Sequence, residues 1–255
     1  MTEAERKAVA KRALRLIDLT DLNDDSSNGA VTALCAKAQT PHGNTAAICI
    51  WPRFIKTARP LLDGTGVKIA TVVNFPGGGT GIEAVLAETR QAIADGADEI
   101  DLVLPYRDFI AHGDALSRAM VRAVQETCGS NAILKVILET GEIRDEALIR
   151  RASELALSEG ADFIKTSTGK VKVNATLEAA RIMLTAIRDS GRKAGFKPAG
   201  GIRSVEDARH YLALADEIMG EGWAKAETFR FGASGLLDDV LAALEGTAHE
   251  GGSAY

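Results

Sequence analysis

Eight short apolar runs recur along the 255-residue chain, and their regular spacing limits the fold more than any other feature of the sequence. The runs are continuous rather than alternating, which is typical of parallel strands that are covered on both faces. Amphipathic, helix-length segments separate them, so that a new run starts roughly every 20 to 35 residues. The predicted strands are 16–20, 46–50, 67–74, 99–104, 133–139, 163–168, 196–199 and 228–232.

This alternation predicts a single-domain TIM (β/α)₈ barrel, because eight strand–helix units in about 250 residues match the usual size of that fold. An open doubly wound sheet is the alternative, but such a sheet usually has fewer strands and would need a nucleotide-binding fingerprint. No Ser/Gly/Pro-rich linker divides the chain. We therefore expect one barrel domain over residues 1–255, with an N-terminal helix and a flexible C-terminal tail at about 247–255.

Polar residues at the edges of the runs predict several local boundaries. Thr80 and Ser204 are each followed three residues later by an acidic residue, which is the spacing of a helix-capping pair. Asn174 is predicted to cap the start of the helix that follows it. The segment 76–81, "PGGGTG", lacks both the GK[ST] ending of a phosphate loop and the spacing of a dinucleotide fingerprint, so we expect a loop–helix junction without a catalytic role.

Composition excludes several classes of partner. A net charge of −5 provides no basic field for nucleic acid. The longest segments without charged residues, 38–52 and 69–82, are short and contain Pro and Gly, so no membrane span is expected. Cys35, Cys49 and Cys128 are widely spaced and predict reduced thiols in a cytoplasmic protein. The histidines share no ligand spacing, so neither a metal nor a cofactor is expected. A homodimer is allowed, but no feature of the sequence indicates it.

Four charged residues interrupt the apolar runs. They are Asp18 in "LIDLT", Asp101 in "EIDLVLP", Lys165 in "DFIKTS" and Lys197 in "GFKPAGG". Inward-pointing residues of different strands meet across the mouth of a barrel, where the active sites of this fold lie. Ion pairs that fill a structural layer are one interpretation, but two lysines with acids on other strands favour a catalytic site. The strand ends add three further candidate lining residues, namely Thr20, Cys49 and Thr168.

Two lysines in one pocket indicate amine chemistry. A lysine becomes a nucleophile when burial or a neighbouring cation lowers its pKa, and its neutral amine can then form a Schiff base with a carbonyl group. Asp101 would be the natural proton shuttle. The residues by themselves leave open which of Lys165 and Lys197 forms the covalent bond and which tunes it.

Small residues beside cations close three of the late strands, in "TSTGK" (166–170), "AGGIR" (199–203) and "GASG" (232–235). Glycines allow backbone N–H groups to approach an anion, and helix N-termini add a favourable dipole. The loops after the seventh and eighth strands of such barrels commonly bind phosphate. Because Lys170 and Arg203 lie within these segments, we predict a phosphate site there.

Long motifs in the order of the chain resemble the deoxyribose-phosphate aldolases, a family of class I aldolases. The motifs include "LIDLT", "GNTAAICIWPRF", "ATVVNFP", "ADEIDLVLPYR", "LKVILETGE", "GADFIKTSTGKV", "GFKPAGGIR" and "RFGASGLL", and they cover essentially the whole chain. The resemblance implies a TIM barrel that reversibly cleaves 2-deoxy-D-ribose 5-phosphate to acetaldehyde and D-glyceraldehyde 3-phosphate.

The same resemblance assigns roles to individual residues. It implies that Lys165 forms the Schiff base, that Lys197 and Asp101 form a proton relay, and that the terminal Tyr255 assists proton transfer at the enamine carbon. Gly235 departs from the serine that many relatives have at this position, so one hydroxyl contact to phosphate is missing. The implied phosphate-binding residues are Gly169, Lys170, Gly200, Gly201, Arg203, Gly232 and Ser234.

Two other functions fit the same fold. A sugar-phosphate isomerase would use a carboxylate as acid and base and would need no lysine adduct. A non-catalytic sugar-phosphate-binding protein would need neither an amine nucleophile nor a proton relay. The presence of Lys165, Lys197 and Asp101 together therefore favours the aldolase.

Overall fold

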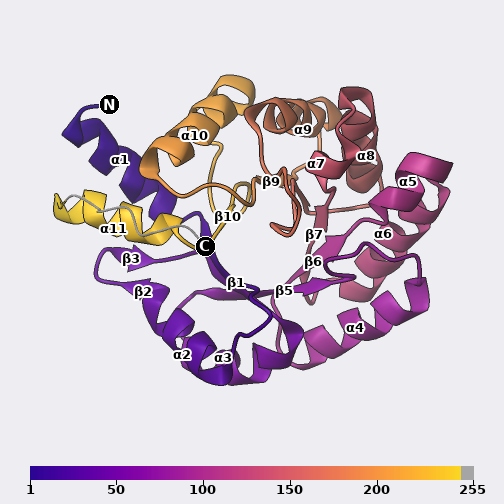
Figure 1. The fold of residues 1–255 in the computed structure, drawn as a ribbon, viewed down its shortest axis with the longest axis horizontal. Coiled ribbons are helices and arrows are strands. Elements are labelled where there is room, and N and C mark those ends of the chain that lie inside the picture. Colours follow the sequence, from indigo (N-terminus) through magenta and orange to yellow (C-terminus); the bar gives the residue numbers. More distant parts are fainter. Residues whose placement is uncertain (248–255) are drawn as a thin grey trace.

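The structure is a computed structural model that describes residues 1–247. Eight parallel strands form one sheet, in the order β10-β1-β4-β5-β6-β7-β8-β9, and backbone bridges from Phe196 to Phe229 and from Ala199 to Gly232 close it (Figure 1). The predicted (β/α)₈ barrel is thus confirmed. The strands are β1 Ile17–Asp21, β4 Ala47–Ile50, β5 Lys68–Val73, β6 Glu99–Val103, β7 Ile133–Ile137, β8 Phe163–Lys165, β9 Gly195–Lys197 and β10 Phe231–Ala233.

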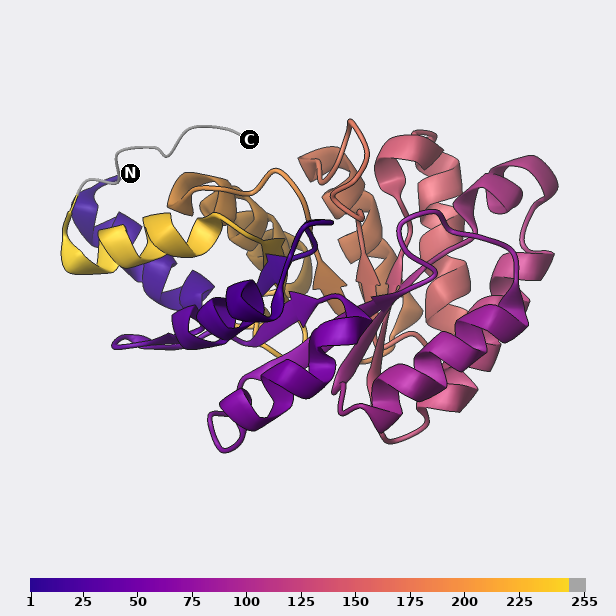
Figure 2. The same ribbon diagram turned by 60° about the horizontal axis from the view of Figure 1, so that its bottom comes forward.

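Eight helices follow the strands and surround the barrel; Figure 2 shows α3 and α4 along its outside, where both contact β5. These helices carry buried apolar residues on one side, as expected for helices that cover a sheet. They are α2 Asn28–Lys37, α3 Ile55–Leu62, α4 Ile82–Ala94, α6 Ala115–Cys128, α8 Glu146–Ser158, α9 Leu177–Ser190, α10 Val205–Met219 and α11 Leu236–Glu245.

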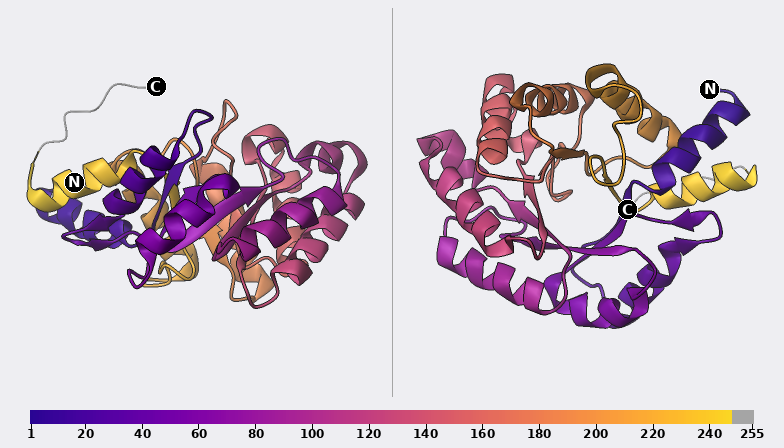
Figure 3. Two further views of the ribbon diagram at one scale, coloured as in Figure 1. Left: turned by 90° about the horizontal axis from the view of Figure 1, so that it is seen from below. Right: turned by 180° about the vertical axis from the view of Figure 1, so that it is seen from behind.

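The remaining elements lie outside this alternation. The N-terminal helix α1, Glu3–Leu14, packs against α10 and α11, and Figure 3 shows it beside α11 from two further sides. Short helices α5, Tyr106–His112, and α7, Thr140–Ile143, follow β6 and β7. The 3₁₀ helix η1 covers Pro52–Phe54, and a small hairpin joins β2, Gln39–Thr40, to β3, Gly43–Asn44. Among the described residues, no helix is long and apolar enough to cross a membrane.

The helix start predicted at Ser204 is confirmed, whereas the other two are wrong. The Ser204 hydroxyl accepts a hydrogen bond from the backbone N–H of Asp207, whose carboxylate accepts one from the Ser204 N–H. Helix α4 starts after Gly81, and no side chain caps it. Helix α9 is capped by Thr176, because that residue has an extended backbone and its hydroxyl accepts from the N–H of Ala179.

Strand β8 ends three residues earlier than predicted, at Lys165. The hydroxyl groups of the following residues bond to neighbouring loops: the Thr166 hydroxyl accepts a hydrogen bond from the N–H of Ala199, and the Thr168 hydroxyl donates one to Glu139. The loop that they start reaches to α9 and forms part of the barrel mouth. The segment 76–81 is a loop before α4, as predicted.

Candidate active site

The two predicted lysines lie side by side on adjacent strands. Lys165 of β8 and Lys197 of β9 are directly opposite each other in the strand register. Both donate to the same carboxylate oxygen, Oδ2 of Asp101 on β6, with Nζ···O distances of 2.7 Å and 2.8 Å. Asp18 of β1 completes the predicted group, since its Oδ2 lies 2.6 Å from Nζ of Lys197.

All four of these charges are buried. Asp18, Asp101 and Lys197 have no exposed surface, and Lys165 is 3% exposed. Burial by itself disfavours each charged form, but the partners outweigh it: neighbouring cations hold the pKa values of Asp101 and Asp18 well below their ordinary values. In the same way, despite burial, the carboxylates of Asp101 and Asp18 raise the pKa of Lys197.

Three further charged residues join this group, and the sequence analysis missed them. Lys135 of β7 donates to Oδ1 of Asp101 at 2.9 Å and to Glu99 of β6 at 2.5 Å. Arg230, which precedes β10, donates to Glu99 at 2.8 Å and to Asp18 at 2.7 Å. The sequence did contain a signal that could have identified them, because each of the three residues interrupts or borders an apolar run, as Lys165 does.

Two glycines make room for the side chains at the barrel centre. A Cβ atom at Gly195 would lie 2.3 Å from the ring of Phe163, which points to the same face as Lys165 because the two residues are two positions apart on β8. A Cβ atom at Gly232 would lie 3.1 Å from Cε of Lys197 and 2.8 Å from Cβ of Ala199. Gly232 therefore has a packing role beside the phosphate contact predicted for it.

A pocket of about 330 Å³ opens at the barrel mouth, and Lys165 lines it. Asp101 and Lys197 are not lining residues, and neither are Asp18 and Cys49, which are fully buried. Burial raises the pKa of the Cys49 thiol, as expected for an unreactive packed residue. Tyr255 lies outside the described residues, and the other predicted site residues all line the pocket: Thr20, Thr168, Gly169, Lys170, Gly200, Gly201, Arg203, Gly232 and Ser234.

The loops on one side of this pocket have backbone conformations that favour glycine. Gly169, Gly200 and Gly201 have φ values of +83°, +83° and +84°. The first of these loops is anchored by Glu139, a buried residue at the end of the predicted strand 133–139, whose carboxylate accepts from both the N–H and the hydroxyl of Thr168. Burial raises the pKa of Glu139, although the Thr168 hydrogen bonds oppose this effect.

Comparison with known proteins assigns this arrangement to a family. Residues 12–239 match the model of the DeoC/LacD family aldolases. The chain is also 60% identical, over 242 residues, to a deoxyribose-phosphate aldolase of Agrobacterium fabrum (strain C58), and the match covers 94% of this chain and 93% of the relative. The chain belongs to the DeoC/LacD family of aldolases. The resemblance found in the sequence motifs is thereby confirmed.

Solved structures agree with this membership of the DeoC/LacD family. A protein of Toxoplasma gondii ME49, provisionally described as a deoxyribose-phosphate aldolase, superposes with a TM-score of 0.89 at 26% identity, covering 97% of this chain and 98% of that one. The deoxyribose phosphate aldolase of Aeropyrum pernix superposes with a TM-score of 0.75 over 95% of both chains. At 23% identity, the latter match speaks for the fold alone.

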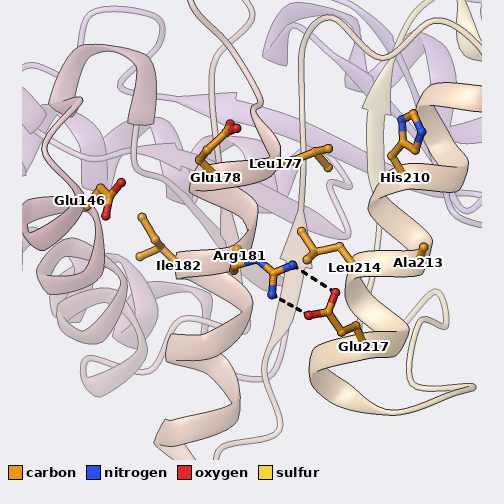
Figure 4. Close-up of a pocket in the computed structure, with 9 residues that line it drawn as sticks. All are labelled: Glu146, Leu177, Glu178, Arg181, Ile182, His210, Ala213, Leu214 and Glu217. Atoms are coloured by element: carbon orange, nitrogen blue, oxygen red, sulfur yellow. Dashed lines mark hydrogen bonds and ion pairs between the residues drawn. The ribbon is translucent and has the colours of Figure 1, made fainter.

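This DeoC/LacD aldolase has a second hollow, of about 440 Å³, on the outside of the barrel between α9 and α10 (Figure 4). Arg181 of α9 and Glu217 of α10 form a two-point ion pair in it, and His210 lies near one end. None of the predicted site residues within 1–247 lines this hollow. Within residues 1–247, no group of three or more His, Cys, Asp or Glu residues could hold a metal ion. The buried lysines therefore make the barrel mouth the candidate active site.

Proposed function

We propose that this protein is a class I aldolase that reversibly cleaves 2-deoxy-D-ribose 5-phosphate to acetaldehyde and D-glyceraldehyde 3-phosphate. The observation that carries the proposal is the amine of Lys165, which lines the mouth pocket and contacts a carboxylate that it shares with a second lysine. The relative of Agrobacterium fabrum, at 60% identity, supports the same activity.

The geometry favours Lys165 over the other lysines as the nucleophile. Lys197 contacts two carboxylates, Asp18 and Asp101, within 2.8 Å, and Lys135 contacts Glu99 and Asp101 within 2.9 Å. Lys165 contacts Asp101 through the oxygen that Lys197 also contacts, and of these three lysines it is the one that lines the pocket. An amine that substrate can reach and that has fewer carboxylate partners is the better candidate for covalent chemistry.

The reaction then follows from the chemistry of amines and carbonyls. The Lys165 amine adds to the aldehyde carbon C1 of the open-chain sugar, and loss of water gives an iminium ion. Asp101, Lys197 and a water take the proton from the 3-hydroxyl group as the C2–C3 bond breaks, and the bonding electrons move onto the iminium to form an enamine. D-glyceraldehyde 3-phosphate leaves, the enamine carbon is protonated, and hydrolysis releases acetaldehyde and the free amine.

Tyr255 lies outside the described residues, and its role is part of the proposal. A phenol can donate and accept a proton, so we assign Tyr255 to proton transfer at the enamine carbon. Replacing it with Phe is expected to slow exchange of solvent deuterium into acetaldehyde about tenfold or more, within the usual contribution of a proton-transfer group. An unchanged exchange rate in Tyr255→Phe would remove it from the mechanism.

The glycine loops and their cations form the proposed phosphate end of the pocket. Lys170 and Arg203 line it, and helix α11 begins directly beyond Ser234. Its N-cap residue, Gly235, provides no side-chain hydrogen bond to the first backbone N–H groups. These N–H groups and the helix dipole favour an anion at that position. The open-chain sugar would then extend from a phosphate bound at this end of the pocket to the amine of Lys165.

The homodimer that the sequence allows stays a prediction. We also propose a cytoplasmic location. In support of it, Cys35, Cys49 and Cys128 are buried and form no disulfide.

Borohydride trapping in the presence of acetaldehyde tests the proposed function. We expect reduction of the imine to add mass to Lys165 alone, located by peptide mass spectrometry. An isomerase or a non-catalytic binding protein would show no adduct under the same conditions. The proposal is wrong if the protein turns over 2-deoxy-D-ribose 5-phosphate without an adduct, or if neither turnover nor adduct is found.

A further inference from the structure

Six buried charged side chains form a closed ring of alternating sign below the mouth pocket. They come from strands β1, β6, β7 and β9 and from the residue before β10, and each is at most 4% exposed. Each member forms an ion pair with the next, and the last pairs with the first. In order around the ring they are Asp101, Lys135, Glu99, Arg230, Asp18 and Lys197.

Two arms of this ring connect Arg230 to opposite oxygens of Asp101. In one arm, Nη2 of Arg230 donates a hydrogen bond to Glu99 at 2.8 Å. Lys135 then donates one hydrogen bond to Glu99 and another to Oδ1 of Asp101. In the other arm, Nη1 of Arg230 donates to Asp18 at 2.7 Å, and Asp18 pairs with Lys197, which donates to Oδ2 of Asp101. The ring thus fixes both oxygens of the central carboxylate.

Lys165 contacts this ring from outside. The ring contains three carboxylates and three cations, so it is neutral as a unit, and Lys165 joins it through Oδ2 of Asp101. Arg230 also contacts the strand that carries Lys165: its guanidinium lies 5.7 Å from the centre of the Phe163 ring, and Phe163 is two positions before Lys165 on the same face of β8. Arg230 therefore supports both Asp101 and the strand that carries the proposed nucleophile.

We propose that Glu99 and Arg230 are positioning residues of the aldolase reaction, an inference that rests on the proposed function above. Their task is to hold Lys135 on Oδ1 of Asp101, so that Oδ2 stays turned toward Lys165 and Lys197. Without Glu99, Lys135 would draw Asp101 and Asp18 toward itself, since its Nζ lies 3.8 Å from Asp18 Oδ2. If Oδ2 of Asp101 were displaced, it would no longer accept hydrogen bonds from both Lys165 and Lys197.

The free-energy cost of burying the six charges of the ring supports a role beyond packing. Buried ion pairs seldom stabilise a protein more than apolar residues of similar volume would, because the charges lose their hydration. Removing one partner, in contrast, leaves an unpaired buried charge. A layer that served packing alone would be filled as well by apolar side chains. Fixed carboxylate geometry is what the ring provides in addition.

Glu99→Gln and Arg230→Met, alone and together, test this inference. Each single variant removes one charge of a neutral ring, and we expect kcat to fall about 10- to 100-fold with KM changed less than about threefold. The double variant removes one charge of each sign and leaves Asp101, Lys135, Asp18 and Lys197 balanced. It should therefore lose less activity than either single variant.

Two readouts separate this inference from the proposed function. Acetaldehyde trapping with borohydride should still label Lys165 in the folded variants, whereas kcat for cleavage of 2-deoxy-D-ribose 5-phosphate should fall, because the relay rather than the amine is displaced. If the wild-type protein formed no adduct, the proposed function would fail, and this inference with it. If all variants formed the adduct and cleaved 2-deoxy-D-ribose 5-phosphate at the wild-type rate, this inference alone would be overturned.

A conservative variant covers the case in which a single variant does not fold. Arg230→Lys keeps the charge, but one ammonium group cannot reproduce the planar guanidinium, in which Nη1 donates to Asp18 and Glu99 and Nη2 donates to the second oxygen of Glu99. We expect it to fold and to lose activity about 3- to 10-fold with normal trapping of Lys165. A wild-type kcat in Arg230→Lys, together with a wild-type kcat in the double variant, would overturn the inference.

Discussion

Lys165 and Lys197 donate to one oxygen of Asp101 at 2.7 Å and 2.8 Å, although they are separated by a complete strand–helix unit of the chain. Their direct pairing in the register of β8 and β9 places them at the same height in the barrel. A single carboxylate oxygen therefore links the proposed nucleophile to the proposed relay. Any change at one lysine alters the surroundings of the other.

Lys165→Ala is expected to abolish both turnover and borohydride trapping, because Lys165 is the one of the three lysines in contact with Asp101 that lines the pocket. Kinetic assays with 2-deoxy-D-ribose 5-phosphate and mass spectrometry of the trapped protein measure the two effects. Lys193→Ala, an exposed lysine before β9, is the matched control and should keep wild-type activity. Normal cleavage by Lys165→Ala would disprove the Schiff-base assignment.

Lys197→Leu should fold but lower kcat by roughly 10²- to 10⁴-fold, the range for loss of a proton-transfer group. The substitution removes the cation that bridges Asp18 and Asp101, and both carboxylates are buried. We therefore also expect stability to fall by about 3–5 kcal/mol, measured by urea unfolding at neutral pH. An unchanged kcat would show that Lys197 is structural only.

Arg203→Ala is expected to raise KM for 2-deoxy-D-ribose 5-phosphate by more than it raises KM for unphosphorylated deoxyribose. Arg203 lines the pocket at the glycine loops, and a guanidinium that binds phosphate contributes in the ground state and the transition state alike. Steady-state kinetics with both sugars make the comparison, and the exposed Arg192→Ala serves as the control. Equal losses on the two sugars would place the phosphate elsewhere.

Stability should fall in acid because of the buried carboxylates. The native pKa values of Asp18 and Asp101 are lower than their ordinary value of 3.8, so below about pH 4 the unfolded chain binds protons that the native protein does not. Each such group contributes a slope of about 1.4 kcal/mol per pH unit between its two pKa values. The stabilisation is present above the unfolded pKa and is lost as pH falls toward the native one.

Asp18→Asn isolates one of these contributions. Urea unfolding from pH 2.5 to 7 should give a shallower acid decline in the variant than in the wild type, even though the variant is less stable at neutral pH. A decline of the same slope in both proteins would mean that Asp18 does not carry a lowered native pKa.

The local pattern of the sequence was sufficient for much of the site. Asp18, Asp101, Lys165 and Lys197 were found because a charge inside an apolar strand is visible within a few residues, and strand ends in a barrel converge. Helix starts were harder to predict. Ser204 has its capping partner three residues away, whereas the loop before α9 offered two competing polar residues, Asn174 and Thr176, and the backbone conformation of the loop selected the second.

The sequence alone determined the barrel, the family and the charges at the strand ends, because apolar runs, their spacing and long motifs are properties of neighbouring residues. The tertiary structure alone decided which charges pair. Arg230 lies 212 residues from Asp18 and 131 from Glu99, yet it bonds to both. Such contacts depend on barrel closure and strand register, which bring distant inward-facing side chains within hydrogen-bond distance and exclude water, so that each buried charge must find a partner.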